Sequence, residues 1–275
     1  VVVQAYGKRA GPVLEWLHAL AERLDRKIMV RLVKGAYWDS EIKHAQVDGR
    51  PGFPVYTRKA ATDVSYIACA GKLLSMTDRI FPQFATHNAH TMAAILEMAG
   101  NSRAFEFQRL HGMGEALHDR ILATEGVQSR IYGPVGAHSD LLAYLVRRLL
   151  ENGANSSFVN QIVDEDVPAA DVAANPIAAL AQAAPTSIAR PAAIFSGRVN
   201  SQGWDLTDEH ALAAIEAARE PFYAATWTAG PLMAAAPAGG EALTIRNPFY
   251  TDDVVGEVTL ASNHDVAAAI NATAP

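Results

Sequence analysis

The sequence predicts an α/β protein whose first part is an incomplete (βα)8 TIM-type barrel. Short β-rich runs alternate with helical patterns from residue 1 to about residue 160, which is typical of βα units built around a parallel sheet. About five strands are expected, more than half of an eight-stranded barrel but too few to close one. The composition then changes to Ala, Pro, Asp and Ser, and a second α/β region follows.

The elements of the first region can be placed in order. Pro12 opens the first helical pattern at a position suited to a helix start, and Gly100 is the expected C-cap of the third. The expected strands are VVVQAY (1–6), KIMVRLVKGAY (27–37), FPQFATHN (81–88) and runs within residues 103–114 and 129–136. The expected helices between them cover residues 12–24, 57–74, 89–100 and 116–126.

A further helix is expected over LLAYLVRRLLENGAN, residues 141–155. Its leucines and valine lie on one half of the helical wheel, and Tyr144, Arg147, Arg148 and Glu151 lie together on the other. This second face could simply be solvated, with Arg147 paired to Glu151 at i,i+4. Alternatively, two guanidinium groups beside a tyrosine could bind a small carboxylate in planar, bidentate geometry.

The rest of the chain divides at the change of composition. Residues 1–162 are expected to form the barrel part, residues 163–193 a linker with one short helix, and residues 194–275 a second region. This second region combines an amphipathic helix with two strands separated by an Asn-Pro turn. The chain begins without Met inside a strand-like run and stops inside a helix-like one, so we expect a piece of a longer polypeptide with the missing strands upstream.

Composition and charge exclude several classes of protein. The 275 residues carry a net charge of -6, which argues against a nucleic-acid site in this chain. The single cysteine, Cys69, lies in an apolar run, so we expect a buried thiol and no disulfide framework. No stretch of about 18 apolar residues and no signal peptide is present, which makes an intracellular location the default expectation.

Polar side chains gather where the predicted strands end. In a βα barrel the active site lies at the carboxyl ends of the strands. Singly, each of these residues could cap a helix or satisfy a loop. Because nearly every strand ends in hydrogen-bonding groups, a functional site is favoured. The strand ends carry Gln4, Arg31, Lys34, Tyr37, Thr86, His87, Asn88, Leu110, His111 and Tyr132, and all of these except Leu110 can form hydrogen bonds through their side chains.

The turn after the second strand allows two kinds of chemistry. Lys34 beside Gly35 could meet a phosphate while the backbone approaches a ligand closely. A lysine at a strand end could instead be a Schiff-base nucleophile, as in barrel aldolases. Tyr37 and Trp38 offer flat surfaces for a ring, or pack the rim. His87 and the histidine at position 90 lack a third ligand at a recognisable spacing, so no metal site is expected.

Four segments together carry a specific resemblance to a known family. MVRLVKGAYWDSEIK, FATHNAHT, FEFQRLHGMGE and LLAYLVRRLLENGAN resemble the proline dehydrogenase domain of the bifunctional bacterial flavoenzymes called proline utilization A, through about residue 162. Downstream, NSQGWDL and NPFYTDDVVGEVTLASNHDVAAAINATA resemble the opening of the aldehyde dehydrogenase domain of these enzymes. The resemblance implies oxidation of L-proline to pyrroline-5-carboxylate by hydride transfer to FAD held at the strand ends.

The resemblance also implies roles for individual residues. Arg31 matches a catalytic residue beside the hydride-accepting nitrogen of the flavin, where a positive charge stabilises the reduced anionic ring. Arg147 and Arg148 match the pair that holds the proline carboxylate. The matches to proline-pocket residues are Tyr37, Leu110, Tyr132 and Tyr144. The matches to flavin contacts are Gln4, Arg31, Val33, Lys34, Gly35, Ala36, Trp38, Thr86, His87, Asn88 and Glu151.

Several expected partners lie outside this chain. The family's lysine and aspartate on earlier strands precede residue 1, and the NAD site of the aldehyde dehydrogenase lies beyond residue 275. The resemblance implies a homo-oligomer, a quinone or membrane electron acceptor, and a cytoplasmic protein or one peripheral to the inner membrane. We expect the piece alone to be inactive. The alternatives are a Schiff-base aldolase using Lys34 and a non-catalytic remnant.

Overall fold

The computed structural model describes residues 1–153, 166 and 168–273. It divides into two compact units, Val1–Trp204 and Asp205–Pro275, which are described separately.

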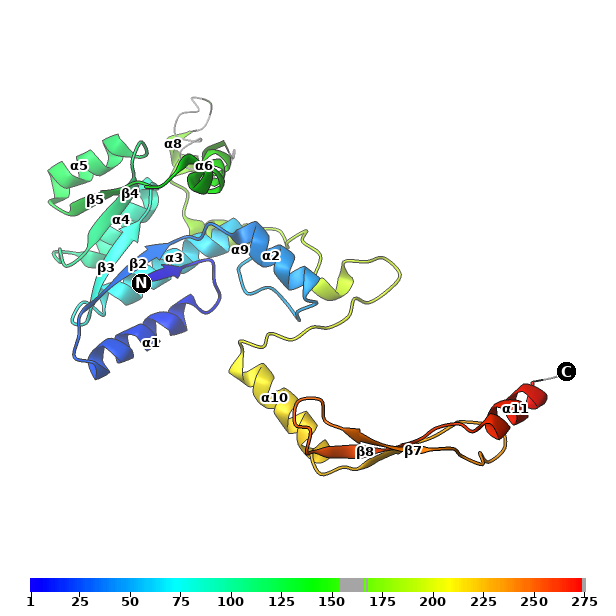
Figure 1. The fold of residues 1–275 in the computed structure, drawn as a ribbon. Coiled ribbons are helices and arrows are strands. Elements are labelled where there is room, and N and C mark those ends of the chain that lie inside the picture. The colour runs from blue at the N-terminus through cyan, green and yellow to red at the C-terminus, as the bar shows by residue number, and fades with distance from the viewer. Residues whose placement is uncertain (154–165, 167, 274–275) are drawn as a thin grey trace. The chain divides into compact units, whose positions relative to one another are not determined.

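The first unit is built on a five-stranded parallel sheet (Figure 1). The strands are β1 (Val2–Gln4), β2 (Ile28–Val33), β3 (Ile80–Ala85), β4 (Glu106–Leu110) and β5 (Gln128–Tyr132). Their order in space is their order in the chain, β1-β2-β3-β4-β5, as a series of βα units produces. This confirms the expected α/β class and parallel sheet.

Helices follow the strands along the chain. They are α1 (Ala10–Arg23), α2 (Trp38–Val47), α3 (Lys59–Leu74), α4 (Ala89–Ala99), α5 (Glu115–Glu125) and α6 (His138–Gly153). The expected extension of the second strand to Tyr37 is wrong, because β2 ends at Val33 and α2 begins at Trp38. Gly35 has φ +130°, and Asp39 and Glu41 in the first turn of α2 suit a helix N-terminus.

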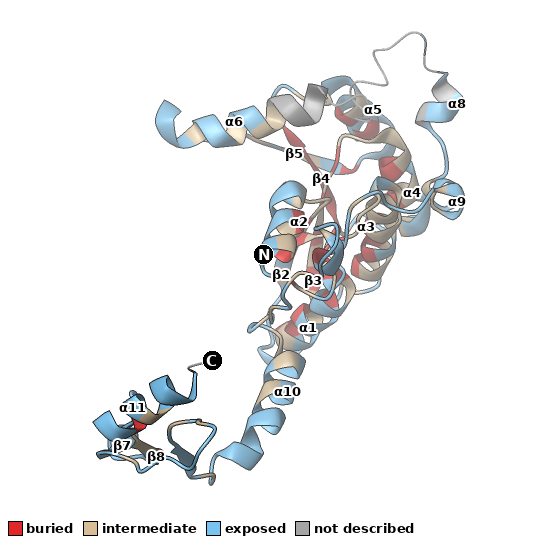
Figure 2. Ribbon diagram, turned by 90° about the vertical axis from the view of Figure 1, so that its right-hand side faces the viewer, coloured by how far each residue is buried: buried red, intermediate tan, exposed pale blue. Residues whose placement is uncertain are grey.

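The core lies on one face of the sheet. Along β2 and β3 the residues alternate, and Val30, Leu32, Ile80 and Phe84 are buried because α1, α3 and α4 pack over them (Figure 2). Cys69 lies in the same core, as expected. Side chains on the opposite face, including Met29, are less covered. This second face is covered unevenly, since β4 is buried on both sides, and polar groups gather on it.

The described part of the expected linker is more ordered than its composition suggested. It contains α8 (Ala169–Val172), α9 (Pro176–Gln182) and the 3-10 helix η1 (Pro191–Ala193). Here α9 packs against α3, and Arg58 Nη1 donates to the Ala183 carbonyl at 3.2 Å. The compact unit continues to Trp204, beyond the expected boundary at residue 193, because this segment returns to contact α2 and the turn after it, where the Gly203 amide donates to the Gly49 carbonyl at 3.0 Å.

The second unit holds a small three-stranded sheet with helices on either side in the sequence. Its elements are α10 (Glu209–Arg219), the 3-10 helix η2 (Glu220–Phe222), β6 (Trp227–Ala229), β7 (Ala242–Arg246), β8 (Val254–Thr259) and α11 (Asn263–Ala272). The spatial order is β6-β8-β7, with β7 antiparallel to β8. Asn247 Oδ1 accepts from the Phe249 amide at 2.9 Å, so the Asn-Pro turn lies between two strands as predicted.

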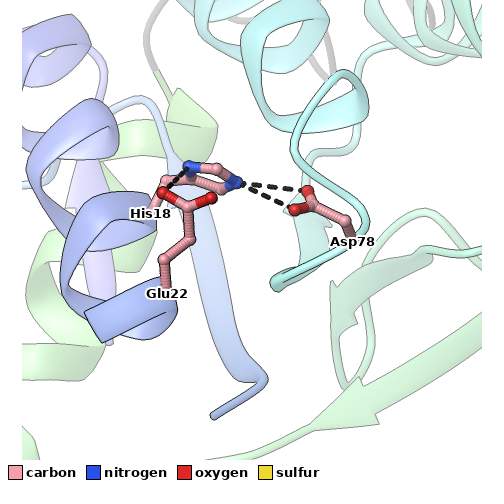
Figure 3. A group of neighbouring side chains, drawn as sticks. All are labelled: His18, Glu22 and Asp78. Atoms are coloured by element: carbon pink, nitrogen blue, oxygen red, sulfur yellow. Dashed lines mark hydrogen bonds and ion pairs between the residues drawn. The ribbon is translucent and has the colours of Figure 1, made fainter. Parts of the chain in front are cut away.

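A histidine ties α1 to the turn that precedes β3 (Figure 3). His18 Nε2 lies 3.1 Å from one Asp78 oxygen and 3.3 Å from the other, while Nδ1 lies 3.6 Å from Glu22 Oε2. Asp78 and Glu22 therefore contact different nitrogens of the His18 ring. This cluster connects α1 to the segment before β3, at the end of the sheet opposite to the carboxyl ends of the strands.

Among the helices that the structure describes, none has both the length and the apolar character needed to cross a membrane.

Candidate functional site

The carboxyl ends of the five strands bring the predicted residues to one edge of the sheet. Gln4, Val33, Leu110 and Tyr132 are the last residues of β1, β2, β4 and β5. Lys34, Gly35 and Ala36 form the connection to α2, and Thr86, His87 and Asn88 form the connection from β3 to α4. Tyr37 precedes α2 and Trp38 begins it. Parallel strands thus collect residues that are up to 128 positions apart in the chain, Gln4 to Tyr132.

Arg31 is held from two directions on the open face. Its Nε donates to Gln108 Oε1 at 2.7 Å, and its Cζ lies 4.5 Å from the centroid of the Tyr132 ring. A guanidinium over an aromatic face is attracted by the negative face of the ring. The strands β2, β4 and β5 therefore fix one cation in a half-buried position.

Tyr132 lies within the field of two arginines. Burial raises the pKa of its phenol, and the charge of Arg31 partly offsets that effect. Tyr144 acts to raise the pKa of Tyr132, and Arg148 acts to lower it. Because charges act over short distances in such a setting, Arg31, Arg148 and both tyrosines belong to one site.

The connection after β2 is shaped by a glycine. A Cβ on Gly35 would lie 2.5 Å from the ring of Tyr6, and φ is +130°, so only glycine suits this position. The carbonyls of Val33 and Lys34 accept from the Ala5 and Tyr6 amides at 2.8 and 2.9 Å. The backbone here is consequently held close against β1, while Ala36 is exposed.

Lys34 forms an ion pair with Asp63 of α3, which Lys59 also contacts at 3.1 Å. A carboxylate at the ammonium group stabilises the charged form of lysine, whereas a Schiff-base nucleophile must be neutral. The ion pair therefore disfavours the aldolase alternative. Trp38, the first residue of α2, donates a hydrogen bond from Nε1 to the Tyr56 carbonyl at 2.8 Å.

The connection after β3 is tightly hydrogen-bonded. Asn88 Oδ1 accepts from the Thr91 amide at 2.9 Å and so caps α4. Thr86 Oγ1 accepts from the Asn88 amide at 3.1 Å. The Thr86 carbonyl lies 3.0 Å from Nε2 of the buried His118, whose Nδ1 lies 2.7 Å from Ser129 Oγ. These bonds fix the backbone of this connection rather than leave it as a free loop.

His87 is a neutral imidazole at this edge. Its Nε2 accepts from the Leu110 amide at 3.1 Å, which places the ring proton on Nδ1. Burial is the main reason that its pKa falls to about 4, and the positive charges of His118, Arg148, Arg109 and Arg31 act in the same direction. A nitrogen engaged by a backbone amide is a poor candidate for a metal ligand.

The two adjacent arginines of α6 point to different neighbours. Arg147 Cζ lies 4.9 Å from the centroid of Tyr37, and Arg148 Cζ lies 5.2 Å from that of Tyr144. Arg148 and Tyr144 line a pocket of about 490 Å³ together with Leu110, His111 and the backbone of Gly112 and Gly133. The side chain of Glu151, near the end of α6, lies outside the described residues.

Some residues of the site were not singled out from the sequence. Glu106 and Gln108 are buried on β4 and face the same side of the sheet as Arg31. Their signal was present, since FEFQRL places positions 106, 108 and 110 on one side of a strand. On α3, Tyr66 Oη lies 3.2 Å from the carbonyls of both Leu32 and Ala85. A helix pattern alone does not reveal that contact.

Comparisons with known proteins place these features in a family. A family profile described as proline dehydrogenase matches residues 1–161. The bifunctional protein PutA of Escherichia coli (strain K12) is 48% identical over 287 residues, covering 98% of this chain and 22% of that protein. The chain thus spans about a fifth of the length of this relative.

Solved structures agree with the sequence comparison. A substituted variant of proline utilization A from Bradyrhizobium japonicum superposes with a TM-score of 0.76 at 51% identity, covering 85% of this chain and 24% of the other. Proline utilization A from Bdellovibrio bacteriovorus, inactivated by N-propargylglycine, gives a TM-score of 0.80 at 32% identity, covering 98% of this chain and 28% of the other. In both comparisons the similarity includes the sequence as well as the fold.

Proposed function

The chain belongs to the proline dehydrogenase family, and on that premise we propose that it supplies much of an FAD site and a proline site in a bifunctional enzyme of proline catabolism. The reaction is oxidation of L-proline to pyrroline-5-carboxylate. The observation that carries this proposal is a pair of arginines held over tyrosine rings at the carboxyl edge of the sheet, with Arg31 4.5 Å from the Tyr132 centroid and Arg148 5.2 Å from that of Tyr144. One cation suits a reduced flavin, and the other suits a substrate carboxylate.

The residues at this edge fit a flavin. FAD would accept the hydride of the substrate when bound. Arg31 would hold positive charge beside the ring, and Lys34 would contribute charge near the phosphates. Gly35, whose missing Cβ leaves room for the Tyr6 ring, would place backbone beside the cofactor, with Trp38 beside the adenine. Gln4, Val33, Ala36, Thr86, His87, Asn88 and Glu151 complete the proposed contacts.

The pocket beside α6 fits a small amino acid. Arg148 would bind the proline carboxylate, and Arg147 would assist it from its position over Tyr37. Leu110, Tyr132 and Tyr144 would enclose the apolar ring. Three of these residues, Leu110, Tyr144 and Arg148, line the pocket of about 490 Å³, a volume within the range of small-molecule sites. Neutral His87 adds no charge to this edge.

The larger assembly is part of the same proposal. Upstream strands would pair with the edge strands β1 and β5 and so close the (βα)8 barrel. Residues 194–275 would begin an aldehyde dehydrogenase domain, whose NAD site lies outside this chain. The complete protein would form a homo-oligomer, pass electrons to a quinone or a membrane acceptor, and work in the cytoplasm or at the inner membrane.

The first experiment is the visible spectrum of the complete polypeptide that carries this sequence. We expect flavin bands that bleach when L-proline is added without oxygen. Bound flavin that ignores proline would overturn the substrate and keep the cofactor. A colourless protein that still folds and takes up no added FAD would overturn the cofactor assignment.

A further inference from the structure

The open face of the sheet carries a buried carboxylate that the proposed reaction does not use. Glu106 is 1% exposed and accepts four hydrogen bonds. Arg130 donates from Nε and Nη2 at 2.7 and 2.8 Å, and the amides of Gln83 and Gln108 donate to Oε1 at 2.7 and 2.8 Å. A carboxylate buried in this way is costly unless it is fully bonded.

One of these donors joins Glu106 to the proposed catalytic cation. Gln108 gives its NH2 group to Glu106 and turns its carbonyl oxygen to Arg31 Nε, at 2.7 Å. A flip of this amide would put its oxygen against the carboxylate and its NH2 against a guanidinium N–H. Both contacts would then be repulsive. The charge of Glu106 therefore sets the orientation of the Gln108 amide.

The same arrangement keeps Glu106 ionised. Burial alone would raise the pKa of Glu106. The hydrogen bonds from Arg130, Gln108 and Gln83 lower the pKa by more than burial raises it, so the pKa lies below its ordinary value. An ionised carboxylate can only accept hydrogen bonds, so near neutral pH Glu106 keeps the NH2 group of Gln108 directed toward itself. The carbonyl oxygen of Gln108 is then directed toward Arg31 Nε, which donates to it.

We propose that Glu106 is a positioning residue for the reaction: acting through the Gln108 amide, it holds the Arg31 guanidinium in the place where charge develops on the flavin. This inference rests on the proposed function. Tyr132 supports the guanidinium from its face, but a ring leaves it free to slide and rotate. The hydrogen bond at Nε removes that freedom, and such positioning matters because preorganised charge costs no rearrangement during reaction.

The two glutamines that share Glu106 provide a matched pair of variants. Gln108→Met and Gln83→Met each remove one amide donor to the same carboxylate oxygen and keep a side chain of similar size. Gln83 lies beside Arg31 in the β2–β3 register, but of the two glutamines it is Gln108 that accepts the hydrogen bond from Arg31. Glu106→Gln removes the negative charge and so tests directly whether that charge orients the Gln108 amide. The measurements are the two-electron reduction potential of bound flavin and the rate of its reduction by L-proline, made on the complete polypeptide.

We expect Gln108→Met and Glu106→Gln to lower the reduction potential and to slow flavin reduction by about tenfold or more. A tenfold change in the redox equilibrium corresponds to about 30 mV for two electrons. The KM for proline should change much less than kcat, because the substrate carboxylate is bound elsewhere. Combining both substitutions should add little to either alone, since they break one connection. Gln83→Met should leave the potential where it is.

Equal potentials in the wild type, Gln108→Met and Glu106→Gln would overturn the inference while leaving the proposed function intact. A shift of the same size in Gln83→Met would also overturn it, because the effect would then be general loss of packing. Unfolding in Glu106→Gln does not obscure the test, since the Gln108 and Gln83 variants retain the carboxylate and its bidentate arginine. Failure of the wild type to be reduced by proline would instead overturn the proposed function.

Discussion

The guanidinium of Arg31 lies face-on to the ring of Tyr132, with its Cζ 4.5 Å from the ring centroid. The two residues are on β2 and β5, with β3 and β4 between them, and the register aligns Arg31 with Gln128, four residues before Tyr132. The contact therefore depends on the reach of the Arg31 side chain toward the carboxyl edge as well as on register. The ring of Tyr132 and one hydrogen bond that Arg31 donates to Gln108 thus define the position of the cation that we assign to the flavin.

Removal of the Tyr132 ring should loosen this cation. Tyr132→Leu deletes an attraction worth about 0.5–2 kcal/mol, so we expect reduction of the flavin by proline to slow by about two- to thirtyfold. Tyr132→Phe keeps the ring face and should fall between Leu and the wild type. Stopped-flow absorbance measures both rates. A Phe variant as slow as the Leu variant would assign the effect to the hydroxyl group instead.

The two arginines of α6 should govern affinity for the substrate. Replacing Arg147 or Arg148 by Met should weaken proline binding by roughly ten- to a hundredfold each, with FAD retained. L-prolinol, which lacks the carboxylate, is the control ligand and should bind the variants and the wild type similarly. Unchanged proline affinity in both variants would rule out the proposed carboxylate site.

Acid should destabilise the first unit through His87. Its pKa is about 4 in the folded chain against an ordinary 6.5, so between these values the unfolded chain binds more protons than the folded chain. The stability is complete above pH 6.5 and declines as the pH falls toward 4, by about 3 kcal/mol at most. His87→Gln keeps an acceptor for the Leu110 amide without titrating. The urea concentration at the unfolding midpoint, measured from pH 7 to pH 4, should therefore fall less in this variant than in the wild type. An equal fall in both proteins would contradict the role of His87 in acid destabilisation.

Gly35 should tolerate no side chain. Gly35→Ala places a Cβ against Tyr6 in an unfavourable backbone conformation, at an expected cost of about 1–3 kcal/mol. Gly52→Ala is the matched control, because a Cβ there meets no atom within 4 Å. Thermal unfolding and FAD titration compare the two. A harmless Gly35→Ala would show that the connection after β2 can shift without consequence.

Asp265 should stabilise the second unit at the N-terminus of α11. It accepts from the Ala238 and Gly239 amides at 2.6 and 3.0 Å and forms a capping box with Ser262. The hydrogen bond from Ser262 is the largest cause that lowers its pKa to about 2. Its contribution is therefore complete above the unfolded value near 3.8 and is lost as the pH falls toward 2. Asp265→Asn should speed hydrogen exchange at residues 238 and 239 at neutral pH, and unchanged exchange would contradict the role.

Much of the fold and the candidate site could be predicted from the sequence because barrels place chemistry by a simple rule. Strand ends such as Tyr132 can be found from the hydrophobic pattern, and a parallel βα order puts them at one edge. The helix over Arg147 and Arg148 was predictable for the same reason, since periodicity is local. The helix α2 was missed because only Ile42 and Ala45 of its ten residues are buried, so its sequence carries little apolar periodicity.

The sequence by itself determined the class of fold, the residues at the strand ends and the family resemblance, all of which depend on local periodicity and short motifs. Only the tertiary structure decided which side chains meet. It directed Arg147 to Tyr37 and Arg148 to Tyr144, paired Lys34 with Asp63, and joined Glu106 to Arg31 through Gln108. These contacts depend on sheet register and helix packing between distant segments, and no single stretch of sequence contains that information.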